Sequence, residues 1–467
     1  MRRADDRAAE RDAAPTSLRS RLDVTTVLAV LLPLLTVAAL LLVRPDVPAA
    51  GPRPPEQTPL TRAVAICPSG DPEAYVTSVS DVGGVVDFRL GDREGTDQVE
   101  PGRVTTLDGG EGPLVVRADG EVAPGLLAGR FSTPLAAAEC RAPASDQWFT
   151  GVGSGARHTS VLELVNPDAG PAVIDATLYG VGGIVDAPDL RGVAVPGRGV
   201  VRLSLAELVP RRDELALHVT TSRGRVSASI RDRYAELGTG GASTDWLGAQ
   251  PEPATSNLLL GLAPGSGLRT LTLLNPSDTE TRARVQLVTS QSVFSPSGLE
   301  EVVLAPQSVT RVSLSDLLDT SAAAGALGLL VDAARPITAT LRSYAGRDLS
   351  HAVPGRPVSE AATVLAPAGD KQLLLAGASQ AGSVSVSAVA ADGTVLAEER
   401  TEVLPGRGYV VDLPRRAALV TVTPRQAEVV GSLLVNDADG SDRGTTVIRF
   451  RPQVTSGLVA SVRPGLP

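Results

Sequence analysis

The sequence is poor in aromatic residues and in net positive charge, and each shortage argues against a class of function. Phe, Trp and Tyr make up only 3% of the 467 residues, which leaves few rings for the stacking surfaces that glycan-binding modules use. The net charge is −9 at pH 7, whereas a nucleic-acid-binding protein needs a basic surface to displace counterions from phosphates. We therefore expect no nucleic-acid partner.

The sequence also lacks the short motifs that identify common catalytic sites. It contains no Gly-x-Ser-x-Gly elbow, no His-Glu-x-x-His pair and no phosphate loop with lysine. The run Gly151–Gly155 is rich in glycine, but it lacks the strand–loop–helix context of a nucleotide site and is interpreted as a turn. The carboxylates of Asp437–Asp442 could bind Ca²⁺, but the glycine stands at the fourth rather than the sixth position of an EF-hand loop, so a hairpin turn explains them.

Histidine is scarce as well, and the three histidines are His158, His218 and His351. None has a Cys, another His or a carboxylate at ligand spacing in the sequence. We interpret them as surface or hydrogen-bonded polar residues that carry no proton or metal. The sequence therefore predicts no cofactor, no metal site and no enzymatic activity.

A charge-free run near the N-terminus predicts a membrane anchor. Residues 24–43 are mostly Leu, Val and Ala, and a helix rising ~1.5 Å per residue over this run spans the ~30 Å hydrocarbon layer. Six arginines precede it, which places the tail, residues 1–23, in the cytoplasm. A cleaved signal peptide, with Val47–Ala49 at the cleavage site, is the alternative, but its apolar core would be shorter. A proline-rich stalk, 44–60, follows, and everything beyond the anchor is expected to lie outside the plasma membrane.

The two cysteines, Cys67 and Cys140, both fall in the first extracytoplasmic block. An even pair in an oxidising compartment predicts a disulfide. A metal site would need more ligands than two distant thiols and scattered histidines supply.

Repeated landmarks divide the rest of the chain. Thr270–Pro276 resembles Ser160–Pro167, and the asparagines of the two stretches lie 109 residues apart, with later landmarks at offsets of 109–110. A fixed offset marks a repeated structural unit. Proline sets φ in these turns and the Asn side chain can hydrogen-bond the local backbone. The residues interpreted as structural turns are Asn166, Pro167, Asn275 and Pro276.

Short alternating runs separated by Gly- and Pro-rich turns predict an all-β fold, with one buried and one solvated face on each strand. Six or seven such runs in about 100 residues indicate tandem immunoglobulin-like sandwiches, with a β-propeller as the structural alternative. Trp148 and Trp246 stand ahead of the second and third blocks and are expected to pack at domain junctions. The predicted sandwiches are 61–147 with the disulfide, 148–245, 246–357 and 358–467.

This layout resembles a known family. The Arg-rich tail, the anchor, the Pro-rich stalk, the Cys67-Pro68 opening and the repeated Leu-x-Leu-x-Asn-Pro sandwiches resemble a family of uncharacterised actinobacterial envelope proteins, a domain of unknown function. The resemblance covers the chain from about residue 20 to its end. It implies a single-pass protein with a repeated sandwich ectodomain, and it transfers no catalytic or binding residue.

These features predict a membrane-anchored, extracytoplasmic scaffold or interaction protein of the cell envelope that is not an enzyme. We expect a rod of four sandwiches whose partner is an envelope protein or a cell-wall polymer. A cell-wall glycan-binding module is the first alternative, and a groove lined with Trp or Tyr would favour it. An enzyme with an unrecognised site is the second, and a convergent cluster of carboxylates and histidines would favour that.

Overall fold

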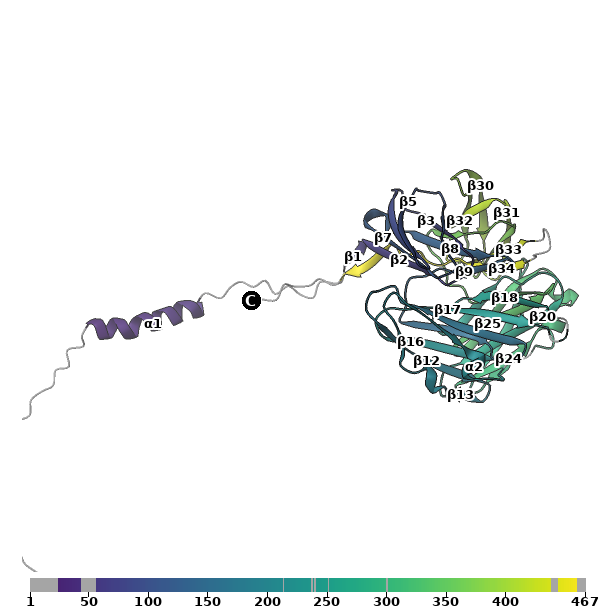
Figure 1. Ribbon diagram of the computed structural model, residues 1–467, viewed down its shortest axis with the longest axis horizontal. Helices are drawn as coiled ribbons and strands as arrows, with labels where there is room; N and C mark the ends of the chain where they lie inside the picture. The colour runs from purple at the N-terminus through teal and green to yellow at the C-terminus, as the bar shows by residue number, and fades with distance from the viewer. Residues whose placement is uncertain are drawn as a thin grey trace, which may run out of the picture. The chain divides into compact units, whose positions relative to one another are not determined.

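The computed structural model describes residues 24–42, 56–212, 214–236, 238, 241–250, 252–299, 301–437 and 444–459. The chain divides into two compact units. One comprises Met1–Glu56 together with Val459–Pro467, and the other comprises Gln57–Leu458. We call the second unit the body (Figure 1).

The first unit contains the helix α1 (Val24–Leu42), with Pro33 inside it. Thr36 Oγ1 lies 2.8 Å from the carbonyl oxygen of Leu32, to which it donates. Within the described residues, no helix combines the length and apolar character needed to cross a membrane. The predicted tail, 1–23, and most of the predicted stalk lie outside the described residues.

The last part of the predicted stalk is a strand rather than an extended linker. It forms β1 (Glu56–Pro59), which pairs with β35 (Ser456–Val459) in a two-stranded ribbon. The Leu60 amide donates to the carbonyl oxygen of Thr455 at 2.9 Å, and Gln57 Nε2 donates to Ser456 Oγ at 2.7 Å. The two ends of the body are therefore joined to each other.

The described part of the body folds into four two-sheet sandwiches that share one strand order. One sheet joins the first, sixth, third and fourth strands, and we call it the leading sheet. The other joins the fifth, second, seventh and eighth strands, and we call it the closing sheet. In an immunoglobulin sandwich the first strand lies with the second and fifth, and the last lies with the third and sixth. Here these end strands have exchanged sheets, so the two-sheet prediction holds but the immunoglobulin strand order does not.

The strand bounds follow this order, with the leading sheet given first. Sandwich 1 has β2 (Arg62–Cys67), β7 (Leu114–Asp119), β4 (Gly84–Leu90) and β5 (Arg93–Val99), then β6 (Thr105–Asp108), β3 (Glu73–Ser78), β8 (Leu126–Ser132) and β9 (Ala136–Glu139). Sandwich 2 has β10 (Asp146–Val152), β16 (Leu215–Arg223), β12 (Ala172–Gly180), β13 (Gly183–Val185) and the extra β14 (Val193–Val195), then β15 (Val200–Ser204), β11 (His158–Val165), β17 (Ser227–Ala235) and β18 (Ala242–Leu247). Sandwich 3 has β19 (Ala254–Leu260), β25 (Ala326–Ala345), β21 (Thr281–Thr289), β22 (Val293–Phe294) and the extra β23 (Val302–Leu304), then β24 (Ser308–Ser313), β20 (Gly267–Asn275), β25 again and β26 (Asp348–Ala352). Sandwich 4 has β27 (Ala362–Leu365), β32 (Ala417–Arg425), β29 (Gly382–Ala390) and β30 (Val395–Val403), then β31 (Tyr409–Leu413), β28 (Asp370–Ala376), β33 (Val430–Asp437) and β34 (Gly444–Arg449). The short helices are η1 (Gly120–Val122), η2 (Pro188–Leu190), α2 (Leu205–Leu208), α3 (Ser315–Leu318) and η3 (Ser321–Ala323).

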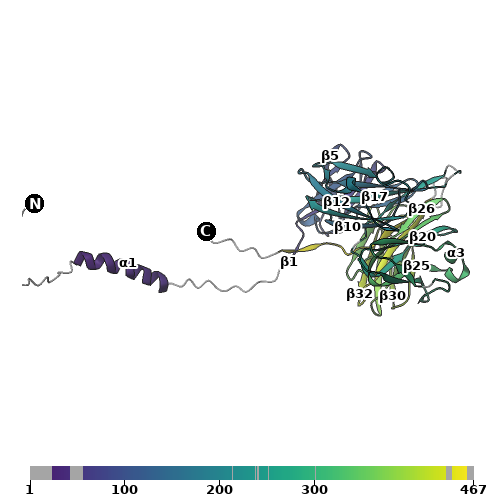
Figure 2. The same cartoon turned by 90° about the horizontal axis from the view of Figure 1, so that it is seen from below.

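The sandwiches form a closed ring, so the predicted rod is wrong. The leading sheets of sandwiches 2 and 3 contact the closing sheet of the next sandwich, and sandwich 4 returns to sandwich 1 through β27 and β8. Between sandwiches 1 and 2, Ile66 and Val115 of the leading sheet pack with Val165 of the closing sheet. At the centre of the ring the last strands touch in a cycle, from β9 to β18, β26, β34 and back to β9. Figure 1 shows β9, β18 and β34 near one another, and Figure 2 shows strands of sandwich 2 beside those of sandwich 3. This radial order resembles a propeller whose blades are sandwiches.

Because each sheet in the ring has a neighbour on both sides, many strands are buried on both faces. Leu273 packs in the core of sandwich 3, whereas the adjacent Leu274 packs against Trp148 of sandwich 2. The same division separates Leu259 from Leu258 and Leu260, which face sandwich 4. The expectation of one solvated face per strand is therefore wrong for these strands.

Candidate functional site

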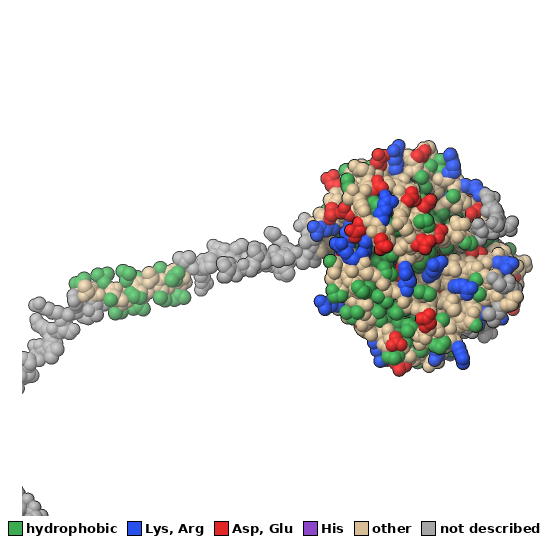
Figure 3. Space-filling view, in the orientation of Figure 1, with side chains coloured by type: hydrophobic (Ala, Val, Ile, Leu, Met, Phe, Trp, Pro, Cys, Tyr) green, Lys and Arg blue, Asp and Glu red, His purple; other side chains and the backbone are tan. Residues whose placement is uncertain are grey.

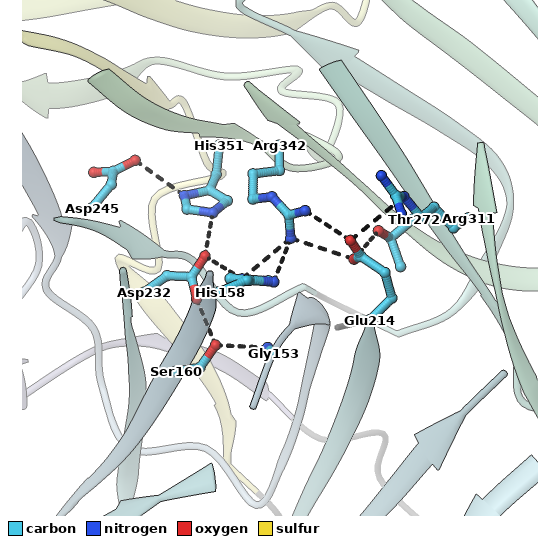
Figure 4. A network of polar contacts seen from close by, with 10 residues as sticks. All are labelled: Gly153, His158, Ser160, Glu214, Asp232, Asp245, Thr272, Arg311, Arg342 and His351. Carbon is cyan, nitrogen blue, oxygen red and sulfur yellow. Dashed lines mark hydrogen bonds and ion pairs between the residues drawn. The ribbon is translucent and has the colours of Figure 1, made fainter. Parts of the chain in front are cut away.

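A group of buried charged and hydroxyl side chains lies between sandwiches 2 and 3 (Figure 4). None of its members is more than 6% exposed. They come from strands of both sandwiches and from the residue before β16, although no two of the charged members are neighbours in the sequence. The members, which we call the buried polar network, are His158, Ser160, Glu214, Asp232, Asp245, Thr272, Arg342 and His351.

Asp232, on β17, is the centre of the network. Nε2 of His158 lies 2.9 Å from both of its carboxylate oxygens, and Nε2 of His351 lies 2.9 Å from Oδ2. Ser160 Oγ donates to Oδ1 at 2.5 Å. A carboxylate taken out of water is tolerated when such partners replace its hydration, so these contacts offset the cost of burying Asp232.

His158 lies between a cation and an anion. Nη1 of Arg342 is 2.6 Å from its Nδ1 and 3.2 Å from its Nε2, and Nε2 also faces the carboxylate of Asp232. His158 therefore links a cation from sandwich 3 to an anion from sandwich 2.

His351, on β26, stands between two carboxylates. Its Nε2 faces Asp232, and its Nδ1 lies 3.2 Å from Oδ2 of Asp245. With an acceptor at each nitrogen, the ring is placed to carry two protons and a positive charge. It thereby bridges β26 of sandwich 3 to β17 and β18 of sandwich 2.

Arg342 and Glu214 form the other half of the network. Nη2 of Arg342 lies 2.7 Å from Oε1 of Glu214, and Thr272 Oγ1 donates to Oε2 at 3.0 Å. The half-exposed Arg311 approaches the same carboxylate at 3.9 Å. Since Glu214 belongs to sandwich 2 and the three other residues to sandwich 3, every contact here crosses the junction.

Burial and the neighbouring charged groups shift the pKa values of the network residues in opposite directions. Burial lowers the pKa of His351, but its hydrogen bonds to Asp232 and Asp245 outweigh this and raise the pKa to about 9. Burial would raise the pKa of Asp232, but its interactions with His158 and His351 hold that pKa below the usual range. For Asp245, burial prevails over the hydrogen bond to His351 and raises the pKa.

The network contains the residue types of an acid–base catalytic site, but its hydrogen bonds differ from those of such a site. In a Ser-His-Asp site the hydroxyl donates to the imidazole, whereas Ser160 donates to Asp232 and its Oγ accepts from the Gly153 amide at 2.9 Å. Of two pockets among the described residues, of about 10 and 260 Å³, neither is lined by a network residue. In the same part of the chain, no three or more His, Cys, Asp or Glu side chains are placed to hold a metal. Among the described residues, the charged groups of the network are hydrogen-bonded to one another.

The predicted disulfide is confirmed. Cys67, at the end of β2, is bonded to Cys140, just after β9. The bond joins the first and last strands of sandwich 1, which lie in different sheets.

Asn166 and Asn275 occupy equivalent, fully buried turns. Nδ2 of Asn166 donates to the carbonyl oxygens of Gly170 and Val195 at 2.8 and 3.2 Å. Nδ2 of Asn275 donates in the same way to Thr279 at 2.8 Å and to Leu304 at 3.2 Å. The prolines that follow, Pro167 and Pro276, continue the turns. In sandwich 4 the corresponding turn uses Gly377, whose φ is +68°.

The two tryptophans lie at junctions but do not occupy equivalent places. Trp148 is within β10, the first strand of sandwich 2, and packs with Leu274 and Val309 of sandwich 3. Its ring stacks on His218, with centroids 3.6 Å apart. Trp246 lies in β18, the last strand of sandwich 2, opposite Arg231 of β17. Sandwich 3 therefore begins after Trp246 and not at it, because β18 completes the preceding sheet.

The sequence interpretation missed the network, since its members are separated by up to 193 residues, from His158 to His351. His158 and His351 are not surface residues but share Asp232. A signal was present in the repeats. The landmark Arg231–Tyr234 corresponds to Leu341–Tyr344, which places Asp232 and Arg342 at the same repeat position with opposite charges.

Fold and network together define the class: an all-β repeat protein whose sandwiches close into a ring and are linked by buried ionic contacts. The chain belongs to a family of unknown function, DUF5719, whose model matches residues 94–414. The match runs from β5 of sandwich 1 to the end of β31 in sandwich 4 and includes the whole buried polar network. None of the curated proteins matches the sequence.

Proposed function

We propose that the chain is a membrane-anchored, extracytoplasmic scaffold of the cell envelope whose body presents a fixed surface to a partner. The observation that carries this proposal is the closure of the ring. Each sandwich is held by two neighbours, through interfaces that bury side chains from both. Packed interfaces of this kind leave little freedom for relative movement of domains, which suits a protein that holds partners at defined positions.

The buried polar network supports the same role. A convergent cluster of histidines and carboxylates was the feature expected to favour an enzyme, and such a cluster exists. Its members, however, form hydrogen bonds and ion pairs with one another. Several of these join sandwiches 2 and 3, for example the ion pair between Arg342 and Glu214. Oδ1 of Asp245 has no hydrogen-bond partner among the described residues, whereas the other charged groups of the network are partnered, and partnered buried charges can specify how two surfaces meet. We therefore assign the network to assembly of the ring.

The proposed location is drawn from the N-terminal sequence and the cysteines. The charge-free run 24–43 follows an arginine-rich tail, which favours an anchor with the body outside. A disulfide between Cys67 and Cys140 fits an oxidising compartment. On the face seen in Figure 3, acidic and basic side chains are interspersed over the half that carries β5 and β30. Such a mixed surface limits non-specific association.

Two hydroxyl variants separate a scaffold from an enzyme. Ser160→Ala and Thr272→Val each remove one buried hydroxyl that donates to a network carboxylate, at a similar cost of about 1 kcal/mol. Only Ser160 lies beside a histidine–aspartate pair and could act as a nucleophile. In a deletion strain we expect both folded variants to restore the wild-type phenotype equally. Failure of Ser160→Ala alone would replace the scaffold by an enzyme.

The anchor is tested separately with a C-terminal fusion to a reporter that is active only in an oxidising compartment. We expect activity with the full chain and none when residues 24–43 are deleted. Quantitative thiol labelling of the unreduced, unfolded chain should detect neither Cys67 nor Cys140. An active fusion that lacks residues 24–43 would remove the anchor from the proposal.

A further inference from the structure

A second group of charged side chains, distinct from the buried polar network, lies near the centre of the ring. Arg449, at the end of β34, is only 4% exposed. Its Nε and Nη2 lie 2.7 and 2.6 Å from the carboxylate oxygens of Glu139, on β9. Its Nη1 donates to the carbonyl oxygen of Pro354 at 2.9 Å, and Nη2 also donates to that of Ala249 at 3.0 Å. Arg449 thus touches both linkers that flank sandwich 3.

Three more arginines surround this contact. Arg141 Nη2 shares the carboxylate of Glu139. Arg451 Nη2 donates to the carbonyl oxygen of Cys140 at 3.4 Å. Arg356 follows Pro354 by two residues and makes no hydrogen bond or ion pair with the described part of the chain. We call these four residues, Arg141, Arg356, Arg449 and Arg451, the central arginine cluster.

The cluster carries more positive charge than its protein partners neutralise. Glu139 is the carboxylate that its members contact, and the buried Nε of Arg141 donates to no described group. This excess of positive charge lowers pKa values in the cluster. The pKa of Arg141 is lowered mainly by burial and further by repulsion from Arg451, Arg449 and Arg356. Burial alone lowers the pKa of Arg449 to about 9. Buried cations are normally paired, so an excess of this kind is a feature of anion-binding sites.

A pocket of about 260 Å³ opens beside the cluster, between the linkers that flank sandwich 3. Arg356 lies on its rim, and the Pro354 and Gly355 that line it are next to the carbonyl that Arg449 holds. Ser256 adds a hydroxyl that makes no hydrogen bond to the described residues. Glu252 lines the same pocket and opposes an anion there. Arg356 and Glu252 are both exposed, so a ligand can reach them from solvent.

From this arrangement we infer that the pocket lined by Gln250, Glu252 and Ser256 on one side and by Pro354–Pro357 on the other binds a multiply charged phosphate-type anion, with Arg356 in direct contact and the rest of the central arginine cluster behind it. Guanidinium groups pair with phosphate oxygens through planar, two-bond contacts. An anion with two or more negative charges balances a cluster of several cations better than a singly charged carboxylate does. Nothing in the scaffold proposal requires this site, and each can fail without the other.

The test is calorimetric titration of the full chain in detergent with sodium pyrophosphate and, separately, inorganic phosphate, at constant ionic strength. We expect pyrophosphate to bind and Arg356→Gln to weaken binding about tenfold, the loss of one charge-assisted contact. Glu252→Gln should tighten binding, because it removes the opposing charge. Arg407→Gln, which removes an exposed arginine from the turn between β30 and β31, is the matched control and should leave binding unchanged.

Each outcome decides the proposal. Absence of binding by both phosphate probes at millimolar concentration, or equal weakening by Arg407→Gln, would overturn it. Citrate binding as tightly as pyrophosphate would replace the phosphate class by carboxylates. Titration with water-soluble dioctanoyl phosphatidic acid and, separately, dioctanoyl phosphatidylcholine then distinguishes a lipid headgroup from a soluble phosphate, since a headgroup site should bind the phosphatidic acid more tightly than inorganic phosphate. Melting temperatures of the variants should equal that of the wild type, because all three residues are exposed.

Discussion

The interface between sandwiches 2 and 3 and the one between sandwiches 3 and 4 have the same geometry but opposite chemistry. In both, a leading sheet packs on the closing sheet of the next sandwich. The second junction is apolar, with Leu258 and Leu260 of sandwich 3 against Leu374, Val430 and Leu434 of sandwich 4. At the first, a small apolar group around Trp148 adjoins the buried polar network. The two junctions therefore share the arrangement of their sheets but differ in the kind of side chain that holds them together.

The difference determines how each junction responds to change. Apolar burial is non-directional and scales with area, so the apolar cluster between sandwiches 3 and 4 should tolerate shape-conserving substitutions and add no pH dependence of its own. Beside it, Asp348 of sandwich 3, whose pKa burial raises to about 6, accepts a hydrogen bond from the Thr445 amide of sandwich 4 at 2.6 Å. Paired buried charges depend on every partner, because a charge left alone inside a protein is costly. The junction of sandwiches 2 and 3 should therefore be sensitive both to single substitutions and to protonation.

The largest expected effect comes from Arg342→Met. The change leaves the buried carboxylate of Glu214 without its close cation, and we expect a loss of about 4 kcal/mol in the free energy of unfolding. Denaturant titration of the full chain measures it. The double variant Arg342→Met/Glu214→Gln should recover part of the loss, because it removes the stranded charge. Arg284→Ala, which breaks an exposed contact with Glu301 at 3.5 Å, is the control and should change stability little.

At the apolar junction, Leu434→Ala should cost about 3 kcal/mol, from lost burial and the cavity left behind. Leu434 is 5% exposed and packs against sandwich 3. In the same denaturant titration, the loss caused by Leu434→Ala, taken against the wild type at the same pH, should be equal at pH 6 and pH 9, because the side chains packed on Leu434 carry no titrating group. A loss that changes with pH would show that the two junctions are coupled and would weaken the contrast.

The third prediction concerns pH. The folded-state pKa of His351 is raised to about 9, from an unfolded value of about 6.5. Its contribution to stability is therefore complete below pH ~6.5 and disappears as the pH rises through ~9. We expect the wild-type free energy of unfolding to fall by roughly 2 kcal/mol across this window, less than the full shift implies because Asp245 competes for the proton.

His351→Gln should remove this dependence and leave a flatter profile between pH 6 and 9. His218→Gln is the matched control, since His218 stacks on Trp148 outside the network. A wild-type profile that is flat over the window would show that His351 does not carry the charge assigned to it.

The smallest effects are expected at the equivalent turns. Asn166→Ala removes hydrogen bonds to two carbonyls and Asn275→Ala removes hydrogen bonds to three, and each should cost about 1 kcal/mol. Thermal unfolding should show similar losses for the two, because both asparagines bond within their own sandwich, although the carbonyl of Pro167 in the first turn also accepts from Arg117 of sandwich 1. A much larger loss at Asn275 would mean that its turn also supports the interface.

Several elements of the fold could be predicted because their signals are local. Alternating runs and Asn-Pro turns indicated sandwiches, and two cysteines in one block indicated the disulfide. The ring could not be predicted in this way, because it depends on contacts between repeats. Its trace in the sequence is the loss of alternation, as in Leu258–Leu260 and Leu273-Leu274. Strands that face two cores read as continuous apolar runs.

The candidate site was harder to predict for the same reason. Asp232 meets His158 on a paired strand but meets His351 across a junction, and no spacing rule connects residues 119 positions apart. The charge reversal between Asp232 and Arg342 at one repeat position was the available clue. Charged residues that replace each other at a repeat position merit attention, because the ring brings successive repeats face to face.

The ribbon of β1 and β35 determines how the body would bear mechanical load. Because Gln57 contacts Ser456 and Leu60 contacts Thr455, the chain enters and leaves the body at one place. A pull between the two ends of the chain acts first on this ribbon, whose few hydrogen bonds yield before any sandwich is stretched. While the ribbon is intact the ring carries no tension, and tension reaches the sandwiches only after the ribbon has opened.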